Sequence, residues 1–458
     1  MNRDVLKPLW SILPTVSKPI RKVSFTEKIL WTTIVLIVYL IMSEMPLYGV
    51  KAQPQDPLYY LRVIFASSNG TLMELGIGPI VTAGLFMQIL QGSKLIKLNL
   101  SNPEDRALFT SANKLFAIVM TLVQAVTVTV RYNADLQTTG VILLQLMIAG
   151  VLLMLMDEML QKGWGLGSGI SLFIVAGTMK TIWWDLFAPA GPMADGKFYG
   201  AVIAYIQGLM SGEGPLAIFF RKGGLPSMSA LLLTVVVFLF FTYIESVKIN
   251  IPLVHDRFRG IKGGFPIKLL YVSVIPAIFA SMLLGNGILL LQTLSSRMSG
   301  NMFVNVLGAF NATTGQPTGG LAYFLVPPRG VAVDDPVRTI VYMAIFIVLA
   351  VVFSMLWVQL SGMDSKAVAN NLLQSGVHIP GYRQSEKPIM TMLDRYIPTV
   401  TIISGLMIGI IVPVTDIMNI FGGGTGVLLA VDILFSYYQL IVRERVEETY
   451  PALARFLR

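Results

Sequence analysis

The sequence predicts an all-α membrane protein that crosses the bilayer ten times. Of its 458 residues, 54% are hydrophobic and only 13% are charged, whereas about 25% of the residues in an average soluble protein are charged. Apolar runs near the length of a membrane span recur along the chain, for example at 29–42, 231–244 and 339–357. The runs are continuous rather than alternating, which argues against a membrane β-barrel.

The expected spans follow the apolar runs in order, five on each side of a long loop at 189–226. We place them at roughly 28–46, 76–94, 112–131, 139–160, 168–188, 227–245, 268–293, 338–359, 397–414 and 425–442. An even number of spans puts both ends of the chain on one side of the membrane. Most of the 34 Lys and Arg residues also fall on that side. The positive-inside rule therefore makes both termini cytoplasmic.

The expected organisation has two halves. A cytoplasmic amphipathic segment (1–27) precedes an N-terminal half (28–188). After the external loop at 189–226 comes a C-terminal half (227–442) and a cytoplasmic tail (443–458). The second and seventh spans, in corresponding positions of the halves, are interrupted near their starts by Pro79 and Pro276. Such paired interruptions are typical of inverted repeats with the working site between them.

Little in the sequence indicates catalysis or metal binding. There is no cysteine, and the two histidines, His255 and His378, lie far apart in polar loops. The glycine-rich stretch "GWGLGSGIS" at 163–171 has no preceding strand and no following Lys-Ser/Thr, so it does not predict a phosphate site. Only Asp432 lies well within a span, which weakens an ion-coupled pump. We expect a non-enzyme without a cofactor.

Two cytoplasmic loops, 246–267 and 360–396, are long and basic. Their charge is explained equally by positive-inside anchoring and by docking of an acidic partner such as ribosomal RNA.

Apolar residues recur just after the glycine- or proline-containing helix starts. They are Ile77, Val81, Ile170, Ile174, Ile278 and Leu429. Two pairs are spaced by four residues and so share a helix face. On periodicity alone, these residues are ordinary helix-packing positions.

Several collinear segments resemble the signature segments of the SecY family of protein-conducting channels. They are "GIGPIVTAGLFMQIL", "GSGISLFIVAG", "VSVIPAIFAS", "HIPGYRQSEK" and "GGGTGVLLAVDIL". The resemblance covers nearly the whole chain in order, and "FRGIKGGFPIK" looks like the archaeal branch. It implies a clamshell of two inverted five-helix repeats that is closed at the back by a SecE-type subunit.

The resemblance also implies an hourglass-shaped channel with a waist of six aliphatic side chains. Matched motif to motif, the pore ring is formed by Ile77, Val81, Ile170, Ile174, Ile278 and Leu429, five of which are branched at Cβ. Aliphatic side chains offer no hydrogen bonds, so a narrow ring of them dewets and resists ions.

The stretch after the first span resembles the family's plug, which blocks the closed pore from outside. We place it at 57–68, with Leu58, Tyr59, Tyr60, Leu61, Arg62, Val63 and Ile64 as its central residues. Arg62 is expected to face an aqueous funnel.

Polar residues on the second, third and seventh spans resemble the family's lateral gate, through which signal sequences pass into lipid. They are Thr82, Gln124 and Asn286. Buried polar groups are costly unless paired, so contacts among these three would hold the gate closed. Each of them alone is also explained by a hydrogen bond within its own helix.

The basic loops resemble the family's docking surface. Arg383 matches a functionally sensitive arginine, and Arg257, Arg259 and Lys262 match a basic tip that faces the ribosome. The implied partners are a SecE-type subunit, a small third subunit of the SecG or Sec-beta type, the ribosome, the nascent polypeptide and membrane lipid.

The expected protein is therefore the central subunit of a translocon in the plasma membrane. It passes secretory chains across the bilayer and releases membrane helices sideways. The alternatives are a secondary transporter of a small solute, which the ten spans and repeats also fit, and a membrane scaffold or insertase without a pore.

Overall fold

The computed structural model describes most of the chain. The described residues are 14–50, 62, 65–92, 95–96, 102–132, 135–193, 195–221, 224–255, 262–297, 306–311, 317–328, 335–374, 377–378 and 386–449. They divide into two compact units. The first unit comprises Met1–Asp185, Gly285–Tyr323 and Leu429–Arg458, and the second comprises Leu186–Leu284 and Phe324–Leu428.

Within the described residues, nine helices are long and apolar enough to cross a membrane. They contain α2 (Phe25–Glu44), α5 (Pro103–Arg131), α6 (Leu136–Met159), α7 (Gly169–Phe187), α10 (Met228–Ser246), α11 (Ile275–Arg297), α14 (Pro336–Leu360), α17 (Ile397–Ile417) and α18 (Gly423–Thr449). The shorter α4 (Gly78–Gly92) occupies the second expected span. The predicted ten-span helical fold class is thus confirmed.

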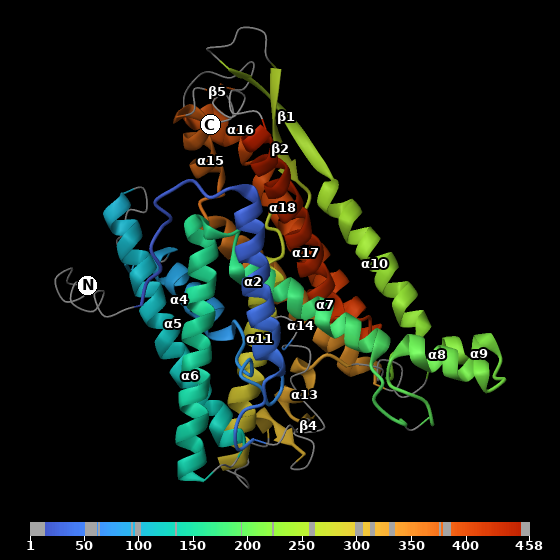
Figure 1. Ribbon diagram of the computed structural model, residues 1–458. Coiled ribbons are helices and arrows are strands. Elements are labelled where there is room, and N and C mark those ends of the chain that lie inside the picture. The colour runs from blue at the N-terminus through green and yellow to red at the C-terminus, as the bar shows by residue number, and fades with distance from the viewer. Residues whose placement is uncertain are drawn as a thin grey trace. The chain divides into compact units, whose positions relative to one another are not determined.

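The first unit is built around α4, α5 and α6, which run side by side (Figure 1). A buried cluster of Ala83 on α4, Ala117 on α5 and Met154 on α6 joins the three helices. A single-turn π-helix, η1 (Leu160–Trp164), leads from α6 toward α7. The short strands β3 (Ala309–Phe310) and β4 (Pro317–Gly319) pair, and the five-residue α13 (Leu321–Leu325) follows them.

The helix α5 begins nine residues before the expected span. Pro103 starts it, and Glu104 and Asp105 lie in its first turn. Proline is favoured in the first turn of a helix, and acidic side chains there interact favourably with the helix dipole. Because these local signals are polar, a search for apolar runs does not detect them.

The second unit holds α10, α14 and α17 together with the short helices α8 (Ala201–Met210), α9 (Pro215–Phe219), α15 (Ser365–Gln374) and α16 (Glu386–Leu393). Helices α14 and α17 pack closely because Gly405 and Gly409 lie against the backbone of α14. A Cβ at Gly409 would lie 2.8 Å from Ile347 Cα.

The basic loop between the sixth and seventh spans (246–267, the 6/7 loop) contains strands that the sequence did not predict. Strands β1 (Lys248–His255) and β2 (Lys262–Lys268) pair antiparallel, and β5 (Val377–His378), from the basic loop between the eighth and ninth spans (360–396, the 8/9 loop), adds to β1. Two loops that are far apart in the sequence are therefore joined by backbone pairing, with His255 opposite Val377.

Candidate functional site

A tight turn joins the expected plug to the start of α4. Gly76 has a φ of +52°, and a Cβ there would lie 2.1 Å from Phe65 O. Such a conformation and so close an approach both require glycine. The next residue, Ile77, donates its N–H to Phe65 O at 2.8 Å and is only 1% exposed. Its carbonyl accepts from Val81 N–H at 3.0 Å, so the two residues are one helical turn apart.

Arg62 is buried, contrary to the expectation that it faces an aqueous funnel. Its guanidinium forms an ion pair with Glu74 at 2.8 Å, and the two residues are 9% and 6% exposed. Arg62 also donates to Asn69 Oδ1 at 3.3 Å, and Glu74 accepts from Gly70 N–H. A buried charge needs a partner, which Glu74 supplies. Glu74 was not predicted from the sequence.

The remaining central plug residues, Leu58, Tyr59, Tyr60, Leu61, Val63 and Ile64, lie outside the described residues. The described end of the plug, residues 65–68, lies against α7. Tyr39 donates its hydroxyl to Ala66 O at 2.9 Å and stacks on Phe173 with ring centroids 4.9 Å apart. A Cβ at Gly177 would lie 3.2 Å from Ala66 Cα. Residues 65 and 66 thus contact both the start of α4 and the middle of α7.

A lysine on α7 adds a polar contact to the same segment. Lys180 Nζ donates to Ser68 Oγ at 3.1 Å and to Ser43 Oγ at 3.0 Å, and it forms an ion pair with Glu44 at 2.5 Å. One ammonium group therefore joins α7, the end of α2 and the end of the plug segment.

The start of α7, which carries Ile170 and Ile174, is held by Asp157 at the end of α6. Asp157 Oδ1 accepts from Ile170 N–H at 3.0 Å and from Ser168 Oγ at 3.1 Å. A Cβ at the intervening Gly169 would lie 2.7 Å from Asp157 Cα. Ile174 is 4% exposed and Ile170 is half-buried. The glycine-rich stretch thus allows a close approach of two helices.

The start of α18 is held in a similar way by Asp416 near the end of α17. Its Oδ1 accepts from Gly424 N–H at 2.7 Å, and a Cβ at Gly424 would lie 1.8 Å from Thr415 Oγ1. Leu429, further along α18, is 2% exposed. The α6–α7 connection joins the fourth and fifth spans, and the α17–α18 connection joins the ninth and tenth. In both halves, therefore, an aspartate near the end of the fourth helix accepts a backbone N–H at the start of the fifth.

Of the six expected ring residues, Ile77, Val81, Ile170, Ile174 and Leu429 lie in the first unit. Ile278 belongs to the second unit, where it is half-buried in the first turn of α11. Within the first unit, residues 65 and 66 contact both Ile77, just before α4, and Gly177 on α7. Tyr437 on α18 accepts a hydrogen bond from Ser168 N–H, just before α7, at 2.9 Å.

Two of the expected gate residues contact one another. Gln124 Nε2 on α5 lies 3.5 Å from Thr82 Oγ1 on α4, and the same hydroxyl donates to Gly78 O at 2.7 Å. Both explanations considered for Thr82, a partner across helices and a bond within its helix, therefore apply. Asn286 is half-buried on α11, and among the described residues neither Thr82 nor Gln124 hydrogen bonds to it.

Only one of the four expected docking residues, Lys262, is among the described residues. Arg257, Arg259 and Arg383 are outside the described residues, and Lys262 is the first residue of β2, opposite Val254. The two histidines, distant in sequence, fall on neighbouring strands, with His255 paired to Val377 and His378 to Val254. No group of three or more potential metal ligands occurs in the part of the chain that is described.

Comparison with known proteins identifies this arrangement. The SecY family model matches residues 71–438, and the model of the plug domain of Sec61p matches residues 37–70. The chain belongs to the SecY family. It is a protein-conducting channel of the SecY/Sec61 type with a plug domain, and a multi-pass membrane protein of the translocon family.

Solved structures of SecY and Sec61 channels match this SecY-family chain over almost its whole length. One is the structure of a protein-conducting channel, with 37% identity, coverage of 98% of this chain and 99% of that chain, and a TM-score of 0.82. Sec61 in the canine ribosome–channel complex from the endoplasmic reticulum has 35% identity, the same coverages and a TM-score of 0.80. The idle yeast Ssh1 complex bound to the 80S ribosome has 26% identity, coverages of 98% and 95%, and a TM-score of 0.79.

Proposed function

We propose that the channel is sealed at its waist by Ile77, Val81, Ile170, Ile174, Ile278 and Leu429. This proposal is supported by the hydrogen bonds that fix the backbone at the helix starts where Ile170 and Ile77 lie. Asp157 accepts the N–H of Ile170 itself, and Phe65 accepts that of Ile77. Backbones held at these points keep aliphatic side chains at a constant radius, as a dewetted seal requires.

The plug segment closes the same path from outside. Its end at residues 65–68 is bonded to Ile77, Tyr39 and Lys180, and Arg62 behind it is paired with Glu74. In a similar structure of SecY, the plug domain stabilises the closed state and maintains a membrane seal. The buried ion pair holds the base of the plug, at Arg62, to the turn that precedes α4.

Thr82, Gln124 and Asn286 form the lateral gate in this proposal. The Thr82–Gln124 contact supplies part of the closed-state energy, because a weak polar contact inside a membrane protein contributes roughly 1 kcal/mol. An apolar signal helix would then favour the open gate by replacing polar contacts with lipid-like ones.

The remaining assignments concern partners and location. The sheet that joins the 6/7 and 8/9 loops supports a single docking surface containing Arg257, Arg259, Lys262 and Arg383, which faces the ribosome. A SecE-type subunit and a small third subunit complete the complex. The channel performs no catalysis, has cytoplasmic termini and lies in the plasma membrane. A solute transporter is not favoured, because the family match accounts for the span pattern.

The ring is tested by ion conductance in planar bilayers. Ile174→Asn and Leu429→Asn are expected to raise the resting conductance severalfold, because a polar side chain lets water wet the constriction. Ile174→Val, which keeps the side chain apolar and β-branched, is the matched control and should stay sealed. Unchanged conductance in both asparagine variants would contradict the ring assignment.

A further inference from the structure

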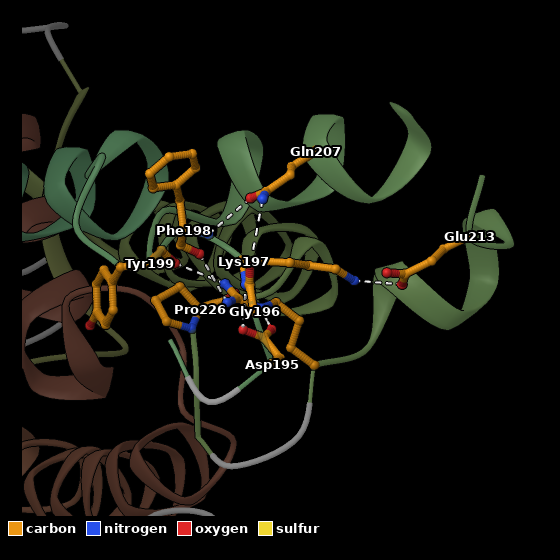
Figure 2. Close-up of polar contacts among 9 residues, drawn as sticks. Asp195, Gly196, Lys197, Phe198, Tyr199, Gln207, Glu213 and Pro226 are labelled. Carbon is orange, nitrogen blue, oxygen red and sulfur yellow. Dashed lines mark hydrogen bonds and ion pairs between the residues drawn. The ribbon is translucent and has the colours of Figure 1, made fainter. Parts of the chain in front are cut away.

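The connection between α7 and α10, residues 188–227, which the proposed topology places on the external side, is a folded elbow in which the charged residues that the structure describes are paired with one another. Arg221 is the organising residue, with a side chain only 3% exposed. It forms an ion pair with Asp195 at 2.9 Å and donates to three backbone carbonyls, those of Phe198, Tyr199 and Pro226. Figure 2 labels the four residues that Arg221 contacts, which are Asp195, Phe198, Tyr199 and Pro226.

A second ion pair, between Lys197 and Glu213, links the start of the elbow to the connection between α8 and α9. Lys197 reaches Glu213 at 2.5 Å, and Gln207 bonds the backbone on both sides of Lys197, accepting from Phe198 N–H at 3.0 Å and donating to Gly196 O (Figure 2). Burial alone would raise the pKa of Asp195, but the hydrogen bonds from Arg221 and from Lys197 N–H, together with the charge of Arg221, outweigh burial and lower that pKa. The carboxylate therefore stays charged and paired at neutral pH.

The two helices of the elbow pack small residues inward and large apolar residues outward. On α8, the inner face contains Ala201, Ala204 and Gly208, and Ile218 of α9 packs on Gly208. The outer side chains are Ile206, Leu209, Met210, Leu216 and Phe220, which are 51%, 45%, 84%, 80% and 64% exposed. A soluble loop would bury such side chains and expose its charges.

Membrane lipid is the occupant that this arrangement fits. The chain enters the elbow from α7 and leaves it into α10, two helices that cross the membrane, so the elbow lies at the bilayer surface. Both α8 and α9 contact α10. The exposed apolar face of α10 begins at Leu232, in its second turn, and continues through Val235, Val236 and Leu239. The apolar surface of the elbow therefore adjoins the lipid-facing surface of a span.

We propose that the elbow is an interfacial anchor, with α8 and α9 lying in the outer leaflet and Met210 and Leu216 inserted among the upper acyl carbons. An amphipathic interfacial helix usually combines apolar insertion with attraction of basic residues to anionic lipid. Among the described residues of the elbow, both cations already have acidic partners. We therefore take apolar contact as the main driving force for insertion.

The test uses the absence of cysteine from the chain. Met210→Cys and Leu216→Cys are labelled with an environment-sensitive fluorophore, in the complex purified with its native subunits and placed in phosphatidylcholine vesicles. Ser211→Cys is the matched control, because Ser211 is exposed and folds its hydroxyl back onto Gln207 O at 2.9 Å. Leu239→Cys on α10 reports lipid contact.

Nitroxide on the upper acyl chain is expected to quench labels at 210 and 216 severalfold more than the label at 211, and aqueous iodide is expected to do the reverse. Adding anionic lipid or salt should change neither result. Iodide quenching at 210 and 216 equal to that at 211 would overturn the proposal, because those residues would face water. Shielding of both from nitroxide and iodide would also overturn it, because a protein subunit would then cover the elbow.

Discussion

Two connections in this channel differ in how much charge and apolar surface they expose. The segment from Arg62 to Ile77, between α2 and α4, buries both partners of its ion pair and holds them with backbone groups. The elbow at 188–227 also buries an arginine, Arg221, but it keeps its Lys197–Glu213 pair near the surface, with the Glu213 side chain 44% exposed, and it exposes large apolar side chains. A connection that must resist displacement buries both charges of its pair, whereas one that contacts lipid presents apolar surface.

The largest expected effect comes from Glu74→Gln. It leaves the Arg62 guanidinium buried without a counter-charge, which costs about 3–5 kcal/mol. The matched change on the elbow, Glu213→Gln, removes a partly exposed pair and should cost at most about 1 kcal/mol. The thermal unfolding midpoint of the purified complex in detergent measures both variants.

A double variant separates loss of the pair from loss of fold at this site. Arg62→Met combined with Glu74→Gln removes the unpaired charge while keeping an acceptor for Gly70 N–H. It should therefore be more stable than Glu74→Gln alone. Equal midpoints for Glu74→Gln and Glu213→Gln would remove the contrast between the two connections.

The second contrast compares two glycines with positive φ. Gly76→Ala would place a Cβ 2.1 Å from Phe65 O, a backbone atom. Crowding and the left-handed conformation together should cost about 2–5 kcal/mol. Gly196 has a φ of +72° and open space around it, so Gly196→Ala bears only the conformational cost of about 1–2 kcal/mol. Similar losses of thermal stability would show that Phe65 does not constrain the turn.

A smaller effect is expected from Tyr39→Phe. The stack on Phe173 is retained, but Ala66 O loses a buried donor, which costs about 1–3 kcal/mol. Because that bond holds the plug segment to α2, the resting ion conductance should rise while the complex remains folded. A variant as tightly sealed as the unmodified channel would indicate that the other contacts hold the plug alone.

Apolar runs were enough to predict the spans, and collinear motifs were enough to predict the family. The contacts that fix the site were harder to foresee. Glu74 reaches Arg62 only after the chain reverses at residues 67–71, and Asp157 reaches Ile170 only after η1 turns the chain. Such contacts join residues across irregular backbone, where no period indicates which side chains meet. The β1–β2–β5 sheet was missed for a similar reason, because its strands come from two loops.

The exposure of Met210 also could not be predicted from composition, because a largely apolar helix of ten residues fits a buried or an exposed position equally well. The orientation became clear only from Ala201, Ala204 and Gly208, which take the inner face.

The central claim, that the six aliphatic residues surround the translocating chain, is tested most directly by crosslinking to a stalled secretory polypeptide. A photoreactive residue is placed at Ile77, at Ile278 or at Leu239, which is 61% exposed on α10. We expect the nascent chain to crosslink from positions 77 and 278 and not from 239. Crosslinking that is absent from 77 and 278 while the polypeptide is stalled within the complex would contradict the ring.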